Sequence, residues 1–220
     1  MSSPVCITGA TGYLGRALSS SLISRGHAVR ALVRPGGAAR VAAGVDVREL
    51  DVFDVDALAA ALAGGGTVVH LIGTPHPNPR KAAEFQRVDL GSARVCAAAA
   101  ARARVAHVVY VSVAQPAPMM HAYVAARAAA EAAFVASGVA ATFVRPWYVL
   151  GPGHRWPYLL LPVYFVAERV PGTREDARRL GLVTLAQMTR ALVAAVEAPP
   201  PGGEARIVDV PAIRAAAPGA

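Results

Sequence analysis

The feature that most limits how this chain can fold is an apolar run that breaks into three regularly spaced glycines. Residues 8–15 read TGATGYLG, with Gly9, Gly12 and Gly15 three apart, and helical spacing of apolar residues follows. In a strand–turn–helix unit the first glycine permits the tight turn, the second lets backbone amides approach a pyrophosphate, and the third lets the helix pack on the strand. The N–H groups at the start of the helix also favour phosphate. The stretch predicts a dinucleotide site formed by Gly9, Thr11, Gly12, Tyr13, Leu14 and Gly15.

Strand and helix patterns alternate along the rest of the chain. Apolar or β-branched runs indicate strands at 4–8, 27–33, 45–50, 67–72, 106–113, 140–145 and 205–210, and alanine-rich segments with helical spacing lie at 13–24, 54–63, 80–103 and 121–137. Such alternation is typical of βαβ units around a parallel sheet buried on both faces. We predict an α/β fold, a single doubly wound Rossmann-type parallel sheet of about seven strands with helices on both faces and a small C-terminal cap. In this prediction residues 1–220 form one domain, and the capping region falls within 147–200.

Composition and charge limit what such a domain binds. A hydrophobic content of 55% in 220 residues is enough to fill one core, and Cys6 and Cys96 lie in apolar segments, which favours buried free thiols in a reducing compartment. The net charge of +8 comes from scattered arginines, without the basic clusters and interleaved aromatic residues of a nucleic-acid groove. The six histidines have no metal-binding spacing. We expect neither a nucleic-acid partner nor a metal site.

The sequence does not predict a segment that targets the chain to a membrane. No signal-peptide pattern precedes the first predicted strand, and the longest apolar segment, 158–167, is short for a bilayer span and contains Pro162. These observations favour a cytoplasmic protein without a transmembrane segment. The proline- and glycine-rich run 198–203 predicts a surface loop, and the tail at 212–220 is expected to fray.

The end of the second predicted strand indicates which dinucleotide binds. An acid about twenty residues after the glycines bonds the ribose 2′-hydroxyl of NAD, whereas an arginine accommodates the 2′-phosphate of NADP. The position nineteen residues after Gly15 is Arg34, and no carboxylate follows it until Asp46. The forked donors of a guanidinium suit a phosphate. The sequence favours NADP(H) over NAD(H), although a solvated arginine after a strand is the plainer interpretation of the same residue.

With these patterns the chain resembles the atypical branch of the short-chain dehydrogenase/reductase superfamily, which includes NmrA-like proteins and accessory proteins of complex I. The motifs that carry the resemblance are TGATGYLG at 8–15, RELDVFD at 48–54, HLIGTP at 70–75, VVYVSV at 108–113 and the segment 123–153, with a looser match at 180–199. The resemblance implies that Asp51 and Val52 border the adenine. It also implies that the cofactor's ribose and nicotinamide pass over Leu71, Ile72 and Gly73.

The resemblance further implies catalytic roles for Ser112, Tyr123 and Arg127. In the family a tyrosine exchanges a proton with the substrate oxygen, a serine orients that oxygen, and a lysine four residues after the tyrosine binds the nicotinamide ribose and favours the ionised tyrosine. Here the lysine position holds Arg127. Either the positive charge is kept in a chain that replaces lysine with arginine, or the proton relay is lost because a guanidinium hardly ever deprotonates. Arg127 and Glu131 could instead form an exposed helix pair.

Three classes of function are open on this evidence. One is an oxidoreductase that moves a hydride between NADP(H) and a small or apolar carbonyl or alcohol, another a non-catalytic NADP(H) sensor or assembly protein, and the third a sugar-nucleotide epimerase or dehydratase. The chain lacks the G-x-S-x-G and P-loop patterns, which argues against α/β-hydrolases and P-loop enzymes.

The predicted cap bears on the substrate and on partners. It holds Trp147, Tyr148, Trp156 and the apolar run 158–170, which suit an apolar small molecule, a peripheral membrane surface or a protein partner. Its expected small size counts against a nucleotide sugar. His76, in the proline-rich loop after the fourth strand, is a further candidate for substrate contact.

Overall fold

The seven strands of the main sheet are parallel, as predicted. In the computed structural model, which describes residues 3–151 and 174–216, these strands are β1 (Val5–Thr8), β2 (Val29–Val33), β3 (Asp46–Glu49), β4 (Thr67–His70), β5 (His107–Val111), β6 (Ala140–Val144) and β9 (Ala205–Val208). Their order is β3-β2-β1-β4-β5-β6-β9. The strand order reverses between β1 and β4, and sheets of this kind bind ligands outside the carboxyl ends of the strands at that point. The predicted Rossmann-type α/β fold is confirmed.

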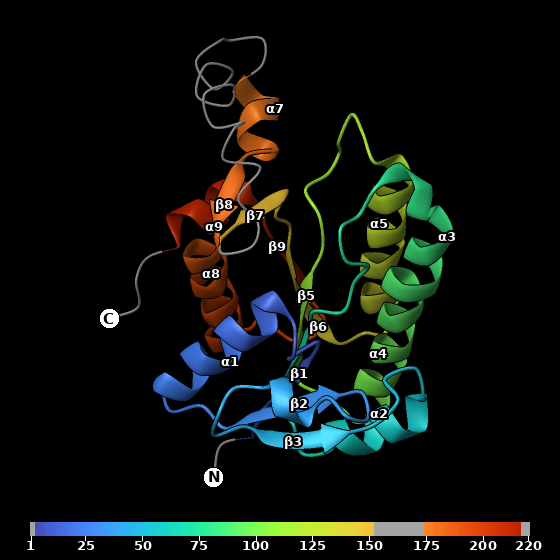
Figure 1. Cartoon of the computed structure of the whole chain (residues 1–220), viewed down its shortest axis with the longest axis vertical. Coiled ribbons are helices and arrows are strands. Elements are labelled where there is room, and N and C mark those ends of the chain that lie inside the picture. Colours follow the sequence, from blue (N-terminus) through green and yellow to red (C-terminus); the bar gives the residue numbers. More distant parts are fainter. Residues whose placement is uncertain (1–2, 152–173, 217–220) are drawn as a thin grey trace.

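Helices cover both faces of the sheet (Figure 1). One face carries α1 (Tyr13–Ser24), α8 (Leu185–Glu197) and α9 (Val210–Ala215), and the other carries α2 (Val55–Leu62), α4 (Gly91–Arg102) and α5 (His121–Ala136). The shorter helical elements are η1 (Ala38–Arg40), η2 (Pro79–Lys81), α3 (Ala82–Glu84), η3 (Phe85–Leu90) and α7 (Arg174–Arg179). Among the helices of the described residues, none has the length and apolar character needed to cross a bilayer.

The core consists of two apolar clusters, one on each face of the sheet. Side chains of β1 alternate between them, since Val5 and Ile7 join the cluster under α1 and α8 whereas Cys6 joins the cluster under α2, α4 and α5. This alternation is what a parallel strand buried on both faces requires. Cys6 and Cys96 are both buried free thiols, as predicted.

The helix predicted at 80–103 is divided into segments. After η2 and α3 the chain forms η3, which is π-helical, and it returns to α-helical geometry at Gly91. A π-helical turn is rare and is found frequently at functional sites. Here it contains Asp89, whose side chain is buried.

Two elements near the C-terminal part of the chain differ from the predictions. The sequence did not indicate the small second sheet, in which β7 (Tyr148–Leu150) pairs in parallel with β8 (Leu182–Thr184). The tail expected to fray from residue 212 begins instead with α9, because Asp209 caps the helix at the Ala212 N–H (3.0 Å) and Ile213 is fully buried. The predicted roles of Trp156 and of residues 158–170 fall outside the described residues.

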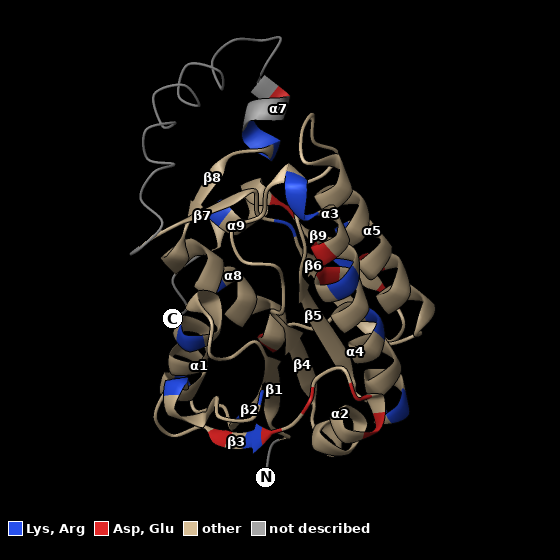
Figure 2. Cartoon of the chain, turned by 45° about the vertical axis from the view of Figure 1, so that its right-hand side comes forward, with Lys and Arg blue, Asp and Glu red and all other residues tan. Residues whose placement is uncertain are grey.

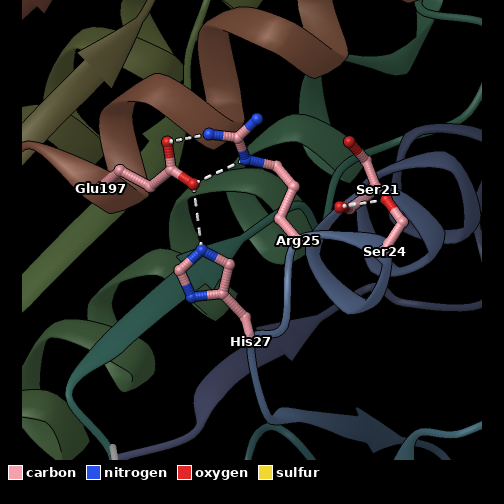
Figure 3. Close-up of polar contacts among 5 residues, drawn as sticks. All are labelled: Ser21, Ser24, Arg25, His27 and Glu197. Carbon is pink, nitrogen blue, oxygen red and sulfur yellow. Dashed lines mark hydrogen bonds and ion pairs between the residues drawn. The ribbon is translucent and has the colours of Figure 1, made fainter. Parts of the chain in front are cut away.

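A polar cluster at the surface joins two distant parts of the chain (Figure 3). Glu197, at the end of α8, accepts hydrogen bonds from Arg25 Nε (2.7 Å) and Nη2 (3.0 Å) and lies 3.0 Å from His27 Nε2. The two Arg25 contacts are bidentate, which is the favourable geometry for an arginine–carboxylate pair. They connect the α1–β2 turn to the C-terminal end of α8.

The edge strand β3 carries charged residues. Its acidic and basic segments are visible at the lower edge of the sheet in Figure 2, and its charged residues are Asp46, Arg48 and Glu49. Charged edge strands disfavour pairing with a second chain. Asp46 forms an ion pair with Arg30 of β2 at 2.9 Å, and this hydrogen bond holds the pKa of Asp46 below its usual value.

Two histidines are buried within the sheet. His70 bridges Thr8 Oγ1 through Nδ1 (2.9 Å) and Ser92 Oγ through Nε2 (3.1 Å), and His107 Nε2 lies 2.9 Å from Thr142 Oγ1. Burial, together with the positive charge of Arg127, lowers the pKa of His70 to about 3. Burial also lowers the pKa of His107 to about 4. Both are neutral structural residues in the folded chain at neutral pH.

We therefore expect the free energy of unfolding to fall between pH 7.5 and pH 5. Below a pKa of about 6.5 an unfolded histidine binds a proton that buried His70 does not, which lowers stability by about 2 kcal/mol at pH 5, and His107 acts in the same direction. Urea unfolding at the two pH values measures the difference. His70→Asn should reduce this difference in the free energy of unfolding. His121→Ala, at an exposed position, should leave the difference unchanged. An equal pH dependence in wild type and His70→Asn would contradict the assignment.

Candidate functional site

The glycine-rich turn after β1 has the geometry that the sequence predicts. Gly9 adopts a φ of +75°, its carbonyl accepts a hydrogen bond from Gly12 N–H at 3.0 Å, and α1 begins at Tyr13. Gly12 is the N-cap residue of α1. Among the described residues, no side chain forms a capping hydrogen bond at the N-terminus of this helix. A Cβ on Gly15 would overlap the Gly9 carbonyl oxygen, so only glycine lets α1 approach this closely. The turn therefore leaves the helix N-terminus open to an anion.

A cavity of about 470 Å³ opens beside this turn. The cavity is lined by the glycine turn, the segments after β4 and β5, the start of α5, and β7 with the residue before it. The lining residues are Gly9, Gly12, Tyr13, Leu14, Gly15, Leu71, His76, Pro77, Val113, Met120, Tyr123, Trp147, Tyr148 and Val149. Most of these side chains are apolar or aromatic, and the predicted contact residue His76 is among them. The cavity therefore combines a phosphate-binding turn with an apolar wall.

A smaller neighbouring cavity of about 240 Å³ brings the three predicted catalytic residues together. Ser112 directly follows β5, Tyr123 lies in the first turn of α5, and Arg127 lies one turn later; all three line this cavity, with Gly73. The Ser112 hydroxyl is buried and has no hydrogen-bond partner among the residues that the structure describes. The Tyr123 ring packs against Phe85 with centroids 5.0 Å apart and lines both cavities. A buried hydroxyl without a partner is costly unless a ligand satisfies it.

Arg127 does not form the exposed pair with Glu131 that one interpretation of the sequence allowed. Its side chain is 7% exposed and forms an ion pair with Asp89 at 2.7 Å, while Nη1 donates to the Val111 carbonyl at 2.7 Å. Glu131 is instead paired with Arg145, whose Nε donates to it at 2.9 Å. The exposed-pair interpretation is wrong because α5 buries both residues against the sheet.

The surroundings of Arg127 keep its charge in place. Burial alone would lower the pKa of Arg127, but the oxygens of Tyr123, Tyr110 and Asp89 together hold it above its ordinary value. Its guanidinium carbon lies 5.2 Å from the ring centroid of Tyr123 and 5.6 Å from that of Tyr110. Burial raises the pKa of Tyr110 to about 12, so this phenol stays neutral. Arg127 is thus a permanent cation between two tyrosine rings.

The residues predicted to contact the adenosine half of a dinucleotide lie at the ends of β2 and β3. Arg34 is exposed immediately after β2, Asp51 is exposed after β3, and Val52 is buried beside it. Asp51 Oδ1 accepts a hydrogen bond from the Phe53 N–H at 3.0 Å. None of these three lines either cavity, and neither do Thr11 and Ile72.

Sequence reasoning missed three polar residues near the site. Asp89 and Thr74 are linked, since the Thr74 N–H and hydroxyl donate to Asp89 Oδ2 at 3.1 and 2.6 Å. Glu49 lies beside Val33 in the β2–β3 register. Its carboxylate accepts a hydrogen bond from the Ala38 N–H at 3.2 Å, so it lies near the turn that holds Arg34. Among the residues with described positions, no three potential metal ligands cluster.

Comparison with known proteins places the chain in a family. Residues 9–156 match the family model described as NAD(P)H-binding. The chain belongs to this family of NAD(P)H-binding Rossmann-fold proteins.

Two curated relatives are named as reductases. The ceramide reductase of Caulobacter vibrioides is 33% identical over 151 residues, which are 68% of this chain and 47% of that protein. A ketoreductase of Stigmatella aurantiaca, named for a 4-hydroxy-2-methyl-3-oxo-4-farnesyl-3,4-dihydroquinoline-1-oxide, is 33% identical over 108 residues, 48% of this chain and 32% of that protein. The chain therefore spans about half the length of the first relative and a third of the second.

Solved structures share the fold. The structure described as MoeE5 in complex with UDP-glucose and NAD has a TM-score of 0.70 and 21% identity, and the match covers 96% of this chain and 79% of that one. At this level of identity the likeness shows the fold alone.

Proposed function

We propose that this chain is an NADP(H)-dependent oxidoreductase that interconverts an apolar carbonyl compound and its alcohol. The observation that carries the proposal is the meeting of Ser112 and Tyr123 in the smaller cavity, next to the larger cavity that the glycine turn and Tyr123 line. The apolar lining from Met120, Trp147 and Val149 suits an apolar substrate. The names of the two curated relatives, a ceramide reductase and a ketoreductase acting on a farnesylated ring, agree with a substrate of this class.

The residues of the site fit a nicotinamide dinucleotide. The glycine turn and the open N-terminus of α1 suit the pyrophosphate, and the partnerless Ser112 hydroxyl and Arg127 Nε are buried polar atoms that a ligand would satisfy. When bound, NADPH supplies a hydride from C4 of its nicotinamide. Arg127 would hold the adjacent ribose in the place that lysine takes in the family that the chain resembles.

Proton transfer is the task of this chain's own side chains. Ser112 donates a hydrogen bond that orients the substrate's carbonyl oxygen, and Tyr123 gives that oxygen its phenolic proton as the carbonyl carbon accepts the hydride. The products are an alcohol and NADP⁺, and Tyr123 regains its proton from solvent. Arg127 does not relay this proton, because its guanidinium stays charged.

We further propose that Arg34 selects NADP(H) over NAD(H). Its exposed guanidinium at the end of β2 is suited to a 2′-phosphate. The nearby carboxylate of Glu49 is engaged by the Ala38 N–H, which leaves it less available to a ribose hydroxyl.

Thermal-shift titration tests the choice of cofactor. NADPH at 100 times its dissociation constant should add about 2.7 kcal/mol of stability, which for a chain of this size raises the melting temperature by roughly 5–10 °C. NADH should give a much smaller shift. Arg34→Ala should lose the preference, whereas Glu49→Gln should keep it. Equal shifts with NADPH and NADH in the wild type would contradict the role of Arg34, and no shift with either would contradict the cofactor site.

An activity screen tests the reaction itself. Purified protein is mixed with NADPH and a panel of long-chain ketones and quinones, and loss of the NADPH absorbance is followed. We expect turnover to increase with the apolar character of the substrate. Binding of NADPH with no turnover on any carbonyl, together with cofactor-dependent binding of a protein, would instead favour a non-catalytic sensor.

A further inference from the structure

The guanidinium of Arg127 is held from two sides. The Asp89 carboxylate lies 2.7 Å from Nη2, and the Val111 carbonyl accepts from Nη1 at 2.7 Å, with the Tyr110 hydroxyl 3.2 Å from the same nitrogen. Asp89 is itself fixed, because its second oxygen accepts two hydrogen bonds from Thr74. The chain after β4 therefore sets the position of Asp89, and Asp89 sets the position of Arg127.

Gly73 provides the space that this arrangement needs. A Cβ at this position would overlap Arg127 Nη2 and lie 3.2 Å from Asp89 Oδ1. The end of an arginine usually swings aside at little cost, but this one would have to give up its contacts with Asp89 and Val111. A lysine ends in a single nitrogen and does not span both partners as a planar fork does.

The charges around Arg127 come from several elements. Asp89 of η3 is the anion, the phenols of Tyr110 and Tyr123 face the guanidinium from β5 and α5, and His70 of β4 is close enough to feel its charge. Arg127 Nε is buried and, within the described parts of the chain, has no hydrogen-bond partner. Since Arg127 lines the smaller cavity, its Nε–H is a donor that a ligand in this cavity could use.

We propose that Asp89 and Gly73 are positioning residues that fix Arg127 so that its Nε–H binds a hydroxyl of the nicotinamide ribose, and that the site is therefore specific for arginine. This inference rests on the proposed function, because it assigns roles within the same site. It predicts that lysine, the residue of the resembled family, is a poor substitute here.

A double-mutant cycle tests the proposal. The variants are Arg127→Lys, Gly73→Ala and the double variant, with Arg94→Lys on the exposed face of α4 and Gly202→Ala, which meets no atom within 4 Å, as matched controls. The dissociation constant of NADPH is measured by fluorescence, with a melting curve for each variant. Arg127→Lys and Gly73→Ala should each weaken NADPH binding about tenfold or more. The double variant should be no weaker than Arg127→Lys, because lysine lacks the nitrogen that the new Cβ overlaps.

Asp89→Asn supplies a readout that a purely structural role would not move. Asparagine keeps the shape of Asp89 but removes the charge that lies 2.7 Å from Arg127 Nη2, so the Nε–H is no longer held in a fixed place. With NADPH and 9,10-phenanthrenequinone as probes, the KM for NADPH should rise about tenfold while kcat changes little. A lower melting temperature with an unchanged KM for NADPH would assign Asp89 to stability alone and overturn its positioning role.

The outcomes separate this inference from the proposed function. Wild-type NADPH affinity in Arg127→Lys, or simple addition of the two single effects, would overturn the inference while leaving the function intact. Failure of the folded wild type to bind NADPH would overturn both. If wild type binds NADPH but does not reduce the quinone, the binding cycle still decides the inference. If Gly73→Ala alone does not fold, recovery of folding in the Arg127→Lys background is the expected result.

Discussion

Tyr123→Phe is expected to reduce kcat for NADPH-dependent carbonyl reduction by about 10²–10⁴-fold, the usual contribution of a general acid. The substitution removes only the phenolic oxygen, and the ring contact with Phe85 at 5.0 Å is retained. Tyr123 is partly exposed and lines both cavities, so its hydroxyl can reach a substrate. The melting temperature and the NADPH dissociation constant should stay nearly unchanged, which separates a chemical role from a structural one.

Tyr148→Phe is the informative comparison. Tyr148 lines the larger cavity with Trp147 but not the smaller one that holds Ser112 and Arg127. Its loss of a hydroxyl should change KM more than kcat. If Tyr123→Phe keeps wild-type kcat, Tyr123 is not the acid, and the meeting of Ser112 and Tyr123 in the smaller cavity would need another explanation.

Those parts of the site that depend on local sequence were predictable. The conformation of the turn that holds Gly9, Gly12 and Gly15 follows from the local sequence, and the structure shows that turn. The prediction that Ser112 and Tyr123 belong to one site also agrees with their shared cavity, because a strand end and the next helix start lie close together in a parallel sheet.

Contacts between distant segments were not predictable in the same way. From the sequence alone, Asp89 has no feature that distinguishes it from other helix residues. The packing of η3 against α5 places its carboxylate beside Arg127. The same holds for Glu49, because its position beside Val33 depends on the β2–β3 register. Contacts between residues of different helices and strands can be predicted only when the fold is already known.

The missed helix α9 is a different case, because its signal was present in the sequence. Asp209 at the N-cap and Pro211 in the first turn are standard helix-start residues. Fraying was expected because the segment lies at the end of the sequence. Burial of Ile213 against α8 stabilises the helix, and that packing cannot be inferred from composition.

Gly15→Ala is expected to abolish the melting shift caused by NADPH and to destabilise the chain. The new Cβ would overlap the Gly9 carbonyl oxygen and lie 2.6 Å from Ala10 Cα. Both are backbone atoms of the same turn, so neither can rotate away as a side chain would. Relief requires α1 to move from the turn, which also displaces the N–H groups that face a phosphate. Overpacking of this kind costs about 1–3 kcal/mol, and the upper end corresponds to roughly 6–12 °C in melting temperature.

Two other glycines make the result specific. Gly202→Ala meets no neighbouring atom within 4 Å and should change neither stability nor NADPH binding. At Gly12 a Cβ would approach only the Gly9 carbonyl oxygen, at 3.2 Å. Because Gly12 is exposed and lines the larger cavity, Gly12→Ala should keep the fold yet weaken NADPH binding. A Gly15→Ala protein that binds NADPH like wild type would show that the turn tolerates a wider separation from α1, and the close approach of helix and strand would then not be required for cofactor binding.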